Sequence, residues 1–589
     1  MSACHNITTL SCRILFFCLL WLLLPALTAP AAERVDVTVS GVEDELRKNV
    51  LASLTIYLHR ESERLQANTV KRLHRRAEED IRSALAPFGY YNPEIKGILS
   101  KTKEGWQAEY VIEKGTPVRV EEVSITVTGA GLDDIALRAA VAAFPVRKED
   151  VLNQKIYEEG KKKLVNAAFG RGYLDASLPR RALRINRENN TAGIHLVLDT
   201  GELYLFGKTT SDQQIIRPDL LNRYLPYSEG EPYSPAKLFE LQSILYRTDY
   251  FSKVAVRSLP EKAFGQAIPV EVDLSPPEHR NKYGFGVGYA TDTGARGKVD
   301  WSNRLFNRHG HKANATFQIA ERENIISFLY QMPVMKDPRY YKAVGAVSYQ
   351  DKNWEDTDTQ LFTSAVSIEY AGPVYQFGTG LELRDELYDV GDTSGDSTLL
   401  VPSLNIGFIL ADDILETKNG LQASLGFLGG VDGLVSDVSF LQATLNGKGV
   451  ITPFEDWRLI GRGSLGATLV DSIDSLPPSL RFYTGGDTSI RGYRYKSIGT
   501  KDQSGAVIGG RYMVVGSIEL ERHIYKQWSV ATFWDGGTAT DDLSLSFFQG
   551  VGVGLRFRLP FGQIRLDVAS AVTEDDTPVR LHFNVGGDL

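Results

Sequence analysis

The chain has 589 residues, of which 54 are glycine, 10% are aromatic and 23% are charged, and its formal net charge is −8. This length exceeds that of one ordinary domain, so several domains are expected. The modest negative charge gives no support for a protein that binds nucleic acid.

The N-terminal segment has the layout of a secretory signal peptide. Arg13 precedes an apolar block that ends at Leu24, and Ala29-Pro30-Ala31 fits the small-x-small rule for cleavage, so residues 1–31 are interpreted as the leader. A transmembrane anchor is the alternative, but the block is short for a span of ~20 residues. All three cysteines lie within the first eighteen residues, so the exported chain would have neither disulfides nor thiolate chemistry.

The next part of the chain repeats one order of predicted elements three times, over residues 33–115, 117–200 and 202–276. Each copy has an alternating strand, a helical segment and two further alternating strands. A tyrosine ends each helical segment and marks a repeat of roughly eighty residues; these are Tyr90, Tyr173 and Tyr250. We interpret the three tyrosines as core residues and not as a binding site.

Short phrases in these copies resemble the POTRA domain, a strand–helix–helix–strand–strand unit. They are GYYNPEI, RGYLDASL and DYFSKVAV, with EKGTPVRV and DTGELYLFG between them. The resemblance implies a small sheet with an open edge, which accepts another extended chain through backbone hydrogen bonds. That chemistry suits a docking arm or a holdase and not an enzyme.

After Pro276-Pro277 the pattern changes to period two. In GVGVGLRFRLP, residues 551, 553, 555, 557 and 559 are apolar, and glycines and arginines occupy the positions between them. Such strands, often about ten residues long, continue to the last residue, and lipid requires a sheet of this kind to close on itself. At ~20 residues per strand and connection, residues 277–589 predict an antiparallel 16-stranded transmembrane β-barrel. A soluble β-rich domain is the alternative.

The stretch GGDTSIRGYRY at 485–495 lies in a long connection, roughly 472–505, late in this barrel. Arginine is always charged and offers a planar fork of donors that suits bidentate pairing with carboxylates. If the connection folds back into a polar lumen, Arg491 meets Asp535 and Glu519 on nearby strands. A surface arginine in an extracellular loop is the alternative. Glu521 has the same strand parity as Glu519 and is a second candidate acceptor.

These motifs resemble the superfamily of outer-membrane assembly barrels that includes BamA, TamA and the two-partner-secretion transporters. The family's Val/Ile-Arg-Gly-Phe/Tyr tetrad, in its sixth extracellular loop, is matched by Ile490, Arg491, Gly492 and Tyr493. Its Phe-x-Asp-x-Gly strand motif is matched by Phe533, Asp535 and Gly537, and the glutamate of its Gly-Ser-x-Glu pattern falls on Glu519. The resemblance implies that the tetrad locks the loop onto these acceptors.

Three modules, the chain length and the stretch YGFGVGYATDTGARGKVDW at 283–301 are similar to the TamA branch of this superfamily. That branch implies a barrel in the outer membrane of a Gram-negative bacterium, with POTRA domains in the periplasm. It also implies an inner-membrane TamB-like partner and client outer-membrane or autotransporter proteins, with membrane lipid around the barrel and no cofactor. The alternative is a two-partner-secretion type pore that exports one dedicated exoprotein, for which two modules and a plug helix would be typical.

The two terminal strands of the barrel predict a lateral seam. Gly284, Gly286 and Gly288 share one parity of the first strand, and glycine weakens a strand because it packs no side chain. The last strand contributes Phe583, Gly586, Gly587 and Leu589. We expect this seam to open sideways and to offer strand edges to a client. The alternative is that small residues fit a crowded lumen.

No catalytic or metal-binding pattern is recognisable. We find no outward-facing Ser/His pair or paired carboxylates, and the nine histidines have no metal-ligand spacing. GFGVG at 284–288 is a barrel strand and not a nucleotide loop, because no helix follows it. The sequence therefore predicts a protein that is not an enzyme.

Overall fold

The structure is a computed structural model. It describes residues 34–62, 65–103, 105–290, 294–414, 416–542, 546–560 and 562–586. The predicted leader lies outside the described residues. The chain divides into two compact units. The first consists of the residues up to Lys208 with residues 229–236 and 260–268, and the second consists of residues 209–228, 237–259 and the chain from Pro269 onward, which includes the barrel. Among the described residues, no helix combines the length and the apolar character that a membrane crossing needs.

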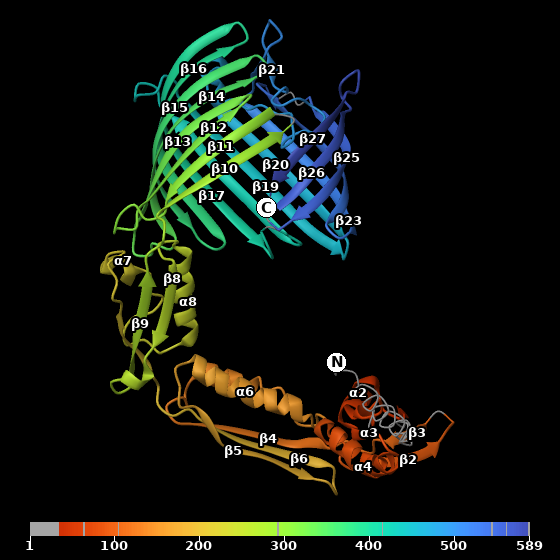
Figure 1. Ribbon diagram of the computed structural model, residues 1–589. Helices are drawn as coiled ribbons and strands as arrows, with labels where there is room; N and C mark the ends of the chain where they lie inside the picture. Colours follow the sequence, from red (N-terminus) through yellow and green to blue (C-terminus); the bar gives the residue numbers. More distant parts are fainter. Residues whose placement is uncertain are drawn as a thin grey trace, which may run out of the picture. The chain divides into compact units, whose positions relative to one another are not determined.

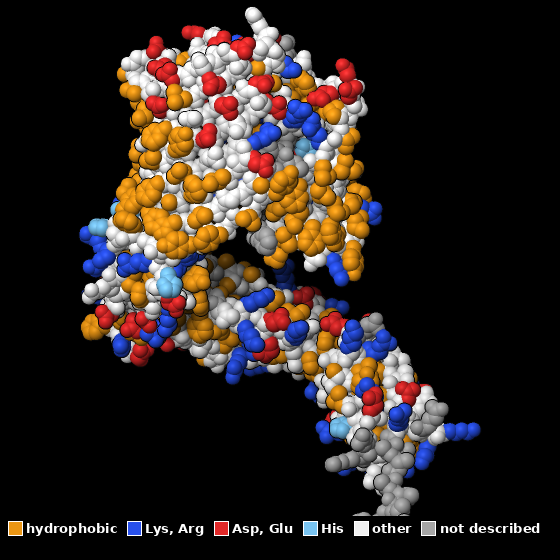
Figure 2. Space-filling view, turned by 45° about the horizontal axis from the view of Figure 1, so that its top comes forward, with side chains coloured by type: hydrophobic (Ala, Val, Ile, Leu, Met, Phe, Trp, Pro, Cys, Tyr) orange, Lys and Arg blue, Asp and Glu red, His pale blue; other side chains and the backbone are white. Residues whose placement is uncertain are grey.

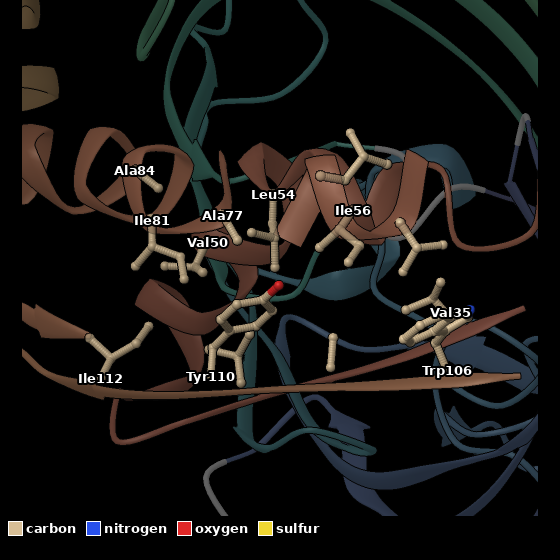
Figure 3. Packing of buried hydrophobic residues seen from close by; sticks show 14 of the residues in the cluster. Val35, Val50, Leu54, Ile56, Ala77, Ile81, Ala84, Trp106, Tyr110 and Ile112 are labelled. Atoms are coloured by element: carbon tan, nitrogen blue, oxygen red, sulfur yellow. The ribbon is translucent and has the colours of Figure 1, made fainter. Parts of the chain in front are cut away.

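The first small sheet has the strand order β1-β3-β2, with β1 parallel and β2 antiparallel to β3. Its elements are β1 (Val35–Ser40), α2 (Asp44–Ser53), α3 (Thr55–Leu58), α4 (Ala67–Leu85), β2 (Glu94–Lys101) and β3 (Trp106–Glu113). One face of α4 is apolar at helical spacing and is buried on the sheet. Figure 3 shows Ala77 and Ile81 of α4 and Val50 of α2 above Tyr110 and Ile112 of β3.

The second small sheet repeats this order as β4-β6-β5. Its elements are β4 (Arg119–Thr128), α5 (Ile135–Ala142), α6 (Gln154–Gly170), β5 (Ser177–Asn186) and β6 (Thr191–Asp199). Side-chain oxygens of Asp134 and Asn153 accept hydrogen bonds from the first backbone N–H groups of α5 and α6. These caps fix where the two helices begin.

The third small sheet has the order β7-β9-β8. Its elements are β7 (Leu205–Thr210), α7 (Pro218–Arg223), α8 (Pro235–Arg247), β8 (Lys253–Ser258) and β9 (Ala267–Ser275). Tyr173 and Tyr250 are buried, and Tyr90 is half-buried against the first core. Three small α/β sheets therefore precede the barrel, and the repeat-marking tyrosines pack as core residues.

The C-terminal part is a single sheet of sixteen strands (Figure 1), which confirms the predicted number. Every consecutive pair in it is antiparallel. The strands are β10 (Asn281–Ala290), β11 (Gly294–Asn303), β12 (Lys312–Ala320), β13 (Glu323–Pro333), β14 (Tyr341–Trp354), β15 (Thr357–Ala371), β16 (Tyr375–Val390), β17 (Thr393–Ala411), β18 (Gly420–Gly430), β19 (Phe440–Phe454), β20 (Trp457–Leu469), β23 (Tyr512–Tyr525), β24 (Trp528–Thr540), β25 (Phe548–Leu559), β26 (Gly562–Ala571) and β27 (Val579–Gly586).

The two faces of the barrel wall differ in polarity. On β25, Val551 and Val553 are 39% and 58% exposed, whereas Arg556 is fully buried. Figure 2 shows outward apolar side chains in orange over the part of the barrel wall that faces the viewer. A soluble β-protein has the reverse arrangement, so this wall is built for lipid outside and a polar lumen inside.

The sheet is nearly closed. The series of hydrogen-bonded neighbours begins at β10 and ends at β27. Within residues 281–290 and 579–586, no ladder pairing joins these two strands. The longest connection, between β20 and β23, covers residues 470–511, slightly more than the predicted 472–505. It holds two 3-10 turns, Ile473–Ser475 and Pro478–Leu480, and two short strands, β21 (Thr500–Lys501) and β22 (Val507–Gly509).

Candidate functional site

The β20–β23 connection lies against the inner face of the barrel wall, and its glycines allow this approach. Gly492 has a φ of +98°, and a Cβ atom there would come within 2.8 Å of the backbone N of Ala571 on β26. A Cβ atom on Gly550 of β25 would lie 1.9 Å from the carbonyl O of Arg491. Because no side chain fits at either position, only glycine lets the two backbones meet.

Arg491 is 4% exposed and pairs with three carboxylates. Its Nε and Nη2 donate to the two carboxylate oxygens of Asp535 at 2.7 and 2.9 Å. Its Nη1 donates to Glu519 at 2.8 Å and to Asp567 at 2.9 Å. The centre of the guanidinium lies 3.3 Å from the ring centroid of Phe533. The arginine thus uses both the bidentate and the stacking geometry for which it is suited.

Two further arginines complete the network. Arg556 of β25 is fully buried; its Nη2 donates to Glu519 at 2.9 Å and its Nη1 donates to Asp567. Arg462 of β20 approaches Asp535 at 3.5 Å. We call this set the arginine–carboxylate cluster; it consists of Arg462, Arg491, Arg556, Glu519, Asp535 and Asp567. Its three cations balance its three anions, which is the condition for burying charge at a tolerable cost.

The sequence identified only part of the cluster. Asp567 and Arg556 are at inward positions of strands with alternating polarity. Alternation shows which face of the sheet a side chain is on, but not how far along the barrel axis it lies. Glu521, the second candidate acceptor, is not a partner of Arg491. It pairs instead with Arg458 at 2.9 Å and with Arg558 at 3.3 Å. Glu519 is therefore the glutamate that Arg491 contacts.

The rest of the tetrad packs beside the cluster. Ile490 and Tyr493 are buried together with Val515 and Ala571 of the wall. The Tyr493 hydroxyl lies 2.9 Å from Oγ1 of Thr573. The acceptor motif is equally constrained, since Phe533 is buried. In addition, a Cβ atom on Gly537 would lie 2.3 Å from the carbonyl O of Val514.

The same loop contacts the last strand of the barrel. The backbone N–H of Gly492 donates to Nε2 of His582 on β27 at 2.9 Å. The other ring nitrogen of His582, Nδ1, pairs with Asp487, which precedes the tetrad in the loop. The connection is therefore tied to β27 as well as to β23, β24, β25 and β26.

The connection also reaches the opposite part of the wall. Nζ of Lys496 lies 3.7 Å from the ring centroid of Trp354 at the end of β14, and 5.4 Å from that of Tyr483. The backbone N–H of Ser479 donates to Glu386 of β16 at 3.2 Å. In the strand order, β14 and β24 are eight strands apart in a sheet of sixteen. The connection therefore spans the lumen.

The seam residues lie at the two free edges of the sheet. On β10, Phe285 and Val287 are 82% and 96% exposed, whereas Val299 and Phe317 of the next strands are 40% and 45% exposed. This difference arises because side chains of β10 have a neighbouring strand on one side only. Phe583 is half-buried on β27, and Gly586 ends that strand. Gly587 and Leu589 lie outside the described residues.

The seam glycines are not forced by crowding. A Cβ atom on Gly284 or Gly286 would meet its nearest neighbour at 3.5 or 3.7 Å, which is ordinary van der Waals contact. At Gly288 the nearest atom, at 2.9 Å, belongs to the flexible side chain of Arg296. A Cβ atom therefore fits at Gly284 and Gly286, and at Gly288 it fits if the Arg296 side chain moves, so crowding alone does not require glycine at these positions.

No candidate metal centre is found in the part of the chain that the structure describes, where no group of three or more His, Cys, Asp or Glu side chains is placed to hold a metal ion.

Comparison with family models identifies the barrel and the first small module. Residues 265–589 match the Omp85 superfamily domain. Residues 36–114 match a POTRA domain described as domain 1 of TamA.

Two similar proteins are outer membrane protein assembly factors BamA. The factor from Nitratidesulfovibrio vulgaris is 26% identical over 422 residues, which cover 67% of this chain and 52% of the relative. The factor from Neorickettsia risticii is 23% identical over 406 residues, covering 63% of this chain and 52% of the relative. The chain thus spans about half the length of the curated relatives it matches.

A solved structure shares the fold. BamA from Haemophilus ducreyi lacking POTRA domains 1–3 superposes with a TM-score of 0.67 at 17% identity, covering 80% of this chain and 99% of that one.

Proposed function

The chain belongs to the Omp85 superfamily, and on this premise we propose that it is a TamA-type assembly barrel of the outer membrane. In this role it inserts or assembles client proteins, including autotransporter-type proteins, through the seam between β10 and β27. The observation that carries the proposal is the arginine–carboxylate cluster, which ties the β20–β23 connection to the strands beside that seam. An assembly barrel with an open seam needs such a brace, because its remaining wall must keep its register while the seam changes.

The mechanism is non-covalent. A client strand would pair with the free backbone groups of β10, in the manner of an added sheet strand. The high exposure of Phe285 and Val287 supports this role of the edge. Each added strand removes unpaired backbone groups from lipid, where such groups are costly. The barrel thereby lowers the barrier to insertion without breaking or forming a covalent bond.

The N-terminal modules serve as the docking arm of this assembly. We place them in the periplasm, where they would contact an inner-membrane TamB-like partner. Support comes from the match of the first module to a TamA-type POTRA domain. The first sheet also ends in β2 (Glu94–Lys101), an edge strand that has one hydrogen-bonded neighbour. Such an edge accepts an extended segment with little demand on its sequence.

Substitution of Arg491 tests the proposal. Arg491→Ala leaves three buried carboxylates with fewer cations, a change worth about 3–5 kcal/mol. We expect a weakened barrel, measured as loss of the heat-modified gel shift at a lower temperature, and impaired assembly of an autotransporter client. The matched control is Arg494→Ala, since the side chain of Arg494 in the same loop is 65% exposed. Full client assembly and an unchanged gel shift in Arg491→Ala would refute the brace.

A further inference from the structure

A cavity of about 520 Å³ lies where helix α8 meets the barrel turns. The residues of α8 that line it and the barrel turns belong to the same compact unit. From the helix side it is lined by Glu240, Ile244, Arg247, Thr248 and Tyr250. From the barrel side it is lined by the ends of β12, β13 and β14 and by the turns 334–340 and 372–374. Neither the cluster nor the seam extends to this cavity.

The cavity is cationic. Its lining includes four basic residues and one acidic residue; these are Arg247, Lys312, Arg339, Lys342 and Glu240. Some of this charge is already balanced, since Arg339 pairs with Asp337 and Glu240. Lys342 lies 3.6 Å from Glu369. The remaining positive charge belongs to Arg247 and Lys312.

Among these basic residues, Lys312 is half-buried and has no carboxylate partner among the described residues. Its Nζ donates to the carbonyl O of Thr248 at 2.7 Å and lies 5.2 Å from the ring centroid of Tyr250. Across the described residues, no carboxylate comes within ion-pair distance of this ammonium. Arg247 likewise has no carboxylate partner there. A half-buried ammonium without an anion is unfavourable, so the cavity is suited to a ligand that brings a negative charge.

The barrel side of the cavity also carries apolar and aromatic residues, Met332 and Tyr340, at the outer face of the wall. Met332 has the strand parity of Ile326 and Phe328, whose side chains are exposed on the outer face of β13. Tyr340 lies 5.8 Å from Tyr370 between ring centroids. Tyr370 occupies an outward-facing position of β15. Aromatic side chains of this kind mark the level of lipid headgroups in membrane barrels.

The turns beside the cavity are basic, whereas the turns 412–419 and 455–456 at the same end of the barrel carry five acidic residues and one lysine. Residues 279–282 and the turns 304–311 and 334–340 carry six lysines or arginines and a single acidic residue, Asp337.

We propose that the cavity binds the headgroup of one anionic glycerophospholipid. The phosphate lies between Arg247 and Lys312, where it supplies the missing negative charge. The first part of an acyl chain follows Met332 and Tyr340 towards the outer face of the barrel. A lipid is favoured over an acidic polypeptide because the cavity joins basic side chains to the aromatic level of the lipid-facing wall. The site requires a barrel in a membrane and is independent of the proposed assembly role.

Native mass spectrometry of the full chain in detergent tests this site. Delipidated protein is titrated with phosphatidylglycerol and, separately, with phosphatidylcholine. We expect one tightly bound phosphatidylglycerol per chain and at least ten-fold weaker binding of phosphatidylcholine. The double variant Arg247→Gln/Lys312→Gln should bind phosphatidylglycerol at least ten-fold more weakly. Lys418→Gln, which removes a charge from an exposed turn at the same end of the barrel, should bind like the unmodified chain.

Several outcomes overturn the assignment. One is equal binding of the two lipids, and another is equal binding by the double variant and Lys418→Gln. Displacement of the lipid by millimolar inorganic phosphate would assign the cavity to free phosphate, and displacement by an acidic peptide would assign it to polypeptide. If the double variant lacks the heat-modified gel shift, it is not folded as a barrel. The site is then tested by labelling the unmodified chain with a photoreactive phosphatidylglycerol. Labels at Met332 or Tyr340 support the site, and labels confined to the outward belt refute it.

Discussion

At the residue scale, the cluster depends on the number of donors that each cation offers. Arg491 makes two bonds to Asp535 and one each to Glu519 and Asp567. The pairing of Arg491 with Asp535 and Glu519 was expected from sequence, because the tetrad and the strand motif are local patterns with a known partner type. The contribution of Arg556 and Asp567 was not, because it requires the relative height of side chains on two strands.

Arg556 gives a prediction at this scale. Arg556→Met would leave Glu519 and Asp567 short of one buried cation, and we expect a loss of about 3–5 kcal/mol in the free energy of unfolding. Urea unfolding of the barrel in lipid vesicles measures this change. The matched control is Arg522→Met, because Arg522 is exposed and stacks over Trp457 at 5.0 Å. A loss in Arg556→Met no larger than in this control would contradict the role of Arg556 in the cluster.

At the scale of elements, the β20–β23 connection behaves as a brace with two ends. One end holds the cluster and β27, and the other places Lys496 over Trp354. The sequence indicated the first end through a glycine-rich motif, which reports a close backbone approach. It gave no sign of the second end, because an aromatic cage is assembled from Trp354 and Tyr483, more than a hundred residues apart.

The Lys496 end predicts a pH dependence. Burial lowers the pKa of Lys496 from its ordinary 10.5 to about 8. Between these two values the undocked side chain binds more protons than the docked one, so docking becomes more favourable as the pH rises from 8 to 10.5. A spin label on Gln503→Cys, at an exposed position of the loop, should become less mobile over this range.

Lys496→Met is the control for this response, since it removes the titrating group. Its label should show no pH response between 8 and 10.5. A label on the unmodified loop that keeps its mobility, or gains mobility, as the pH rises would refute the effect.

At the scale of the whole molecule, the number of strands could be predicted from the sequence, but the absence of ladder pairing between β10 and β27 could not. Sixteen strands follow from the length of the region and the spacing of its turns, both of which are local quantities. Whether β10 pairs with β27 depends on the register of strands some three hundred residues apart. No local sequence pattern specifies that register. The glycines at 284, 286 and 288 indicate only that β10 forms a weak strand.

Closure itself gives a prediction. Cysteines at Phe285 and Phe583 face outward on the two edge strands, and oxidation should join them and block client assembly if the seam opens. Because no ladder pairing fixes the register between these edges, the outward positions 283, 285 and 287 are tested in turn against 583. The control is Val299→Cys/Phe317→Cys, a directly paired position on β11 and β12, which cross-links the wall without sealing the seam. Full activity despite complete cross-linking of the seam pair would exclude lateral opening.

The brace across the lumen has an electrical consequence. A tethered polypeptide that runs from β14 and β16 on one side to β24 on the other divides the water column inside the cylinder. Hydrated ions that cross the barrel must then pass this loop and its charged side chains, whereas an open pore would hold only bulk water. Such a barrel should conduct ions poorly for its diameter, and under the proposed function it would limit ion leakage while the seam is open.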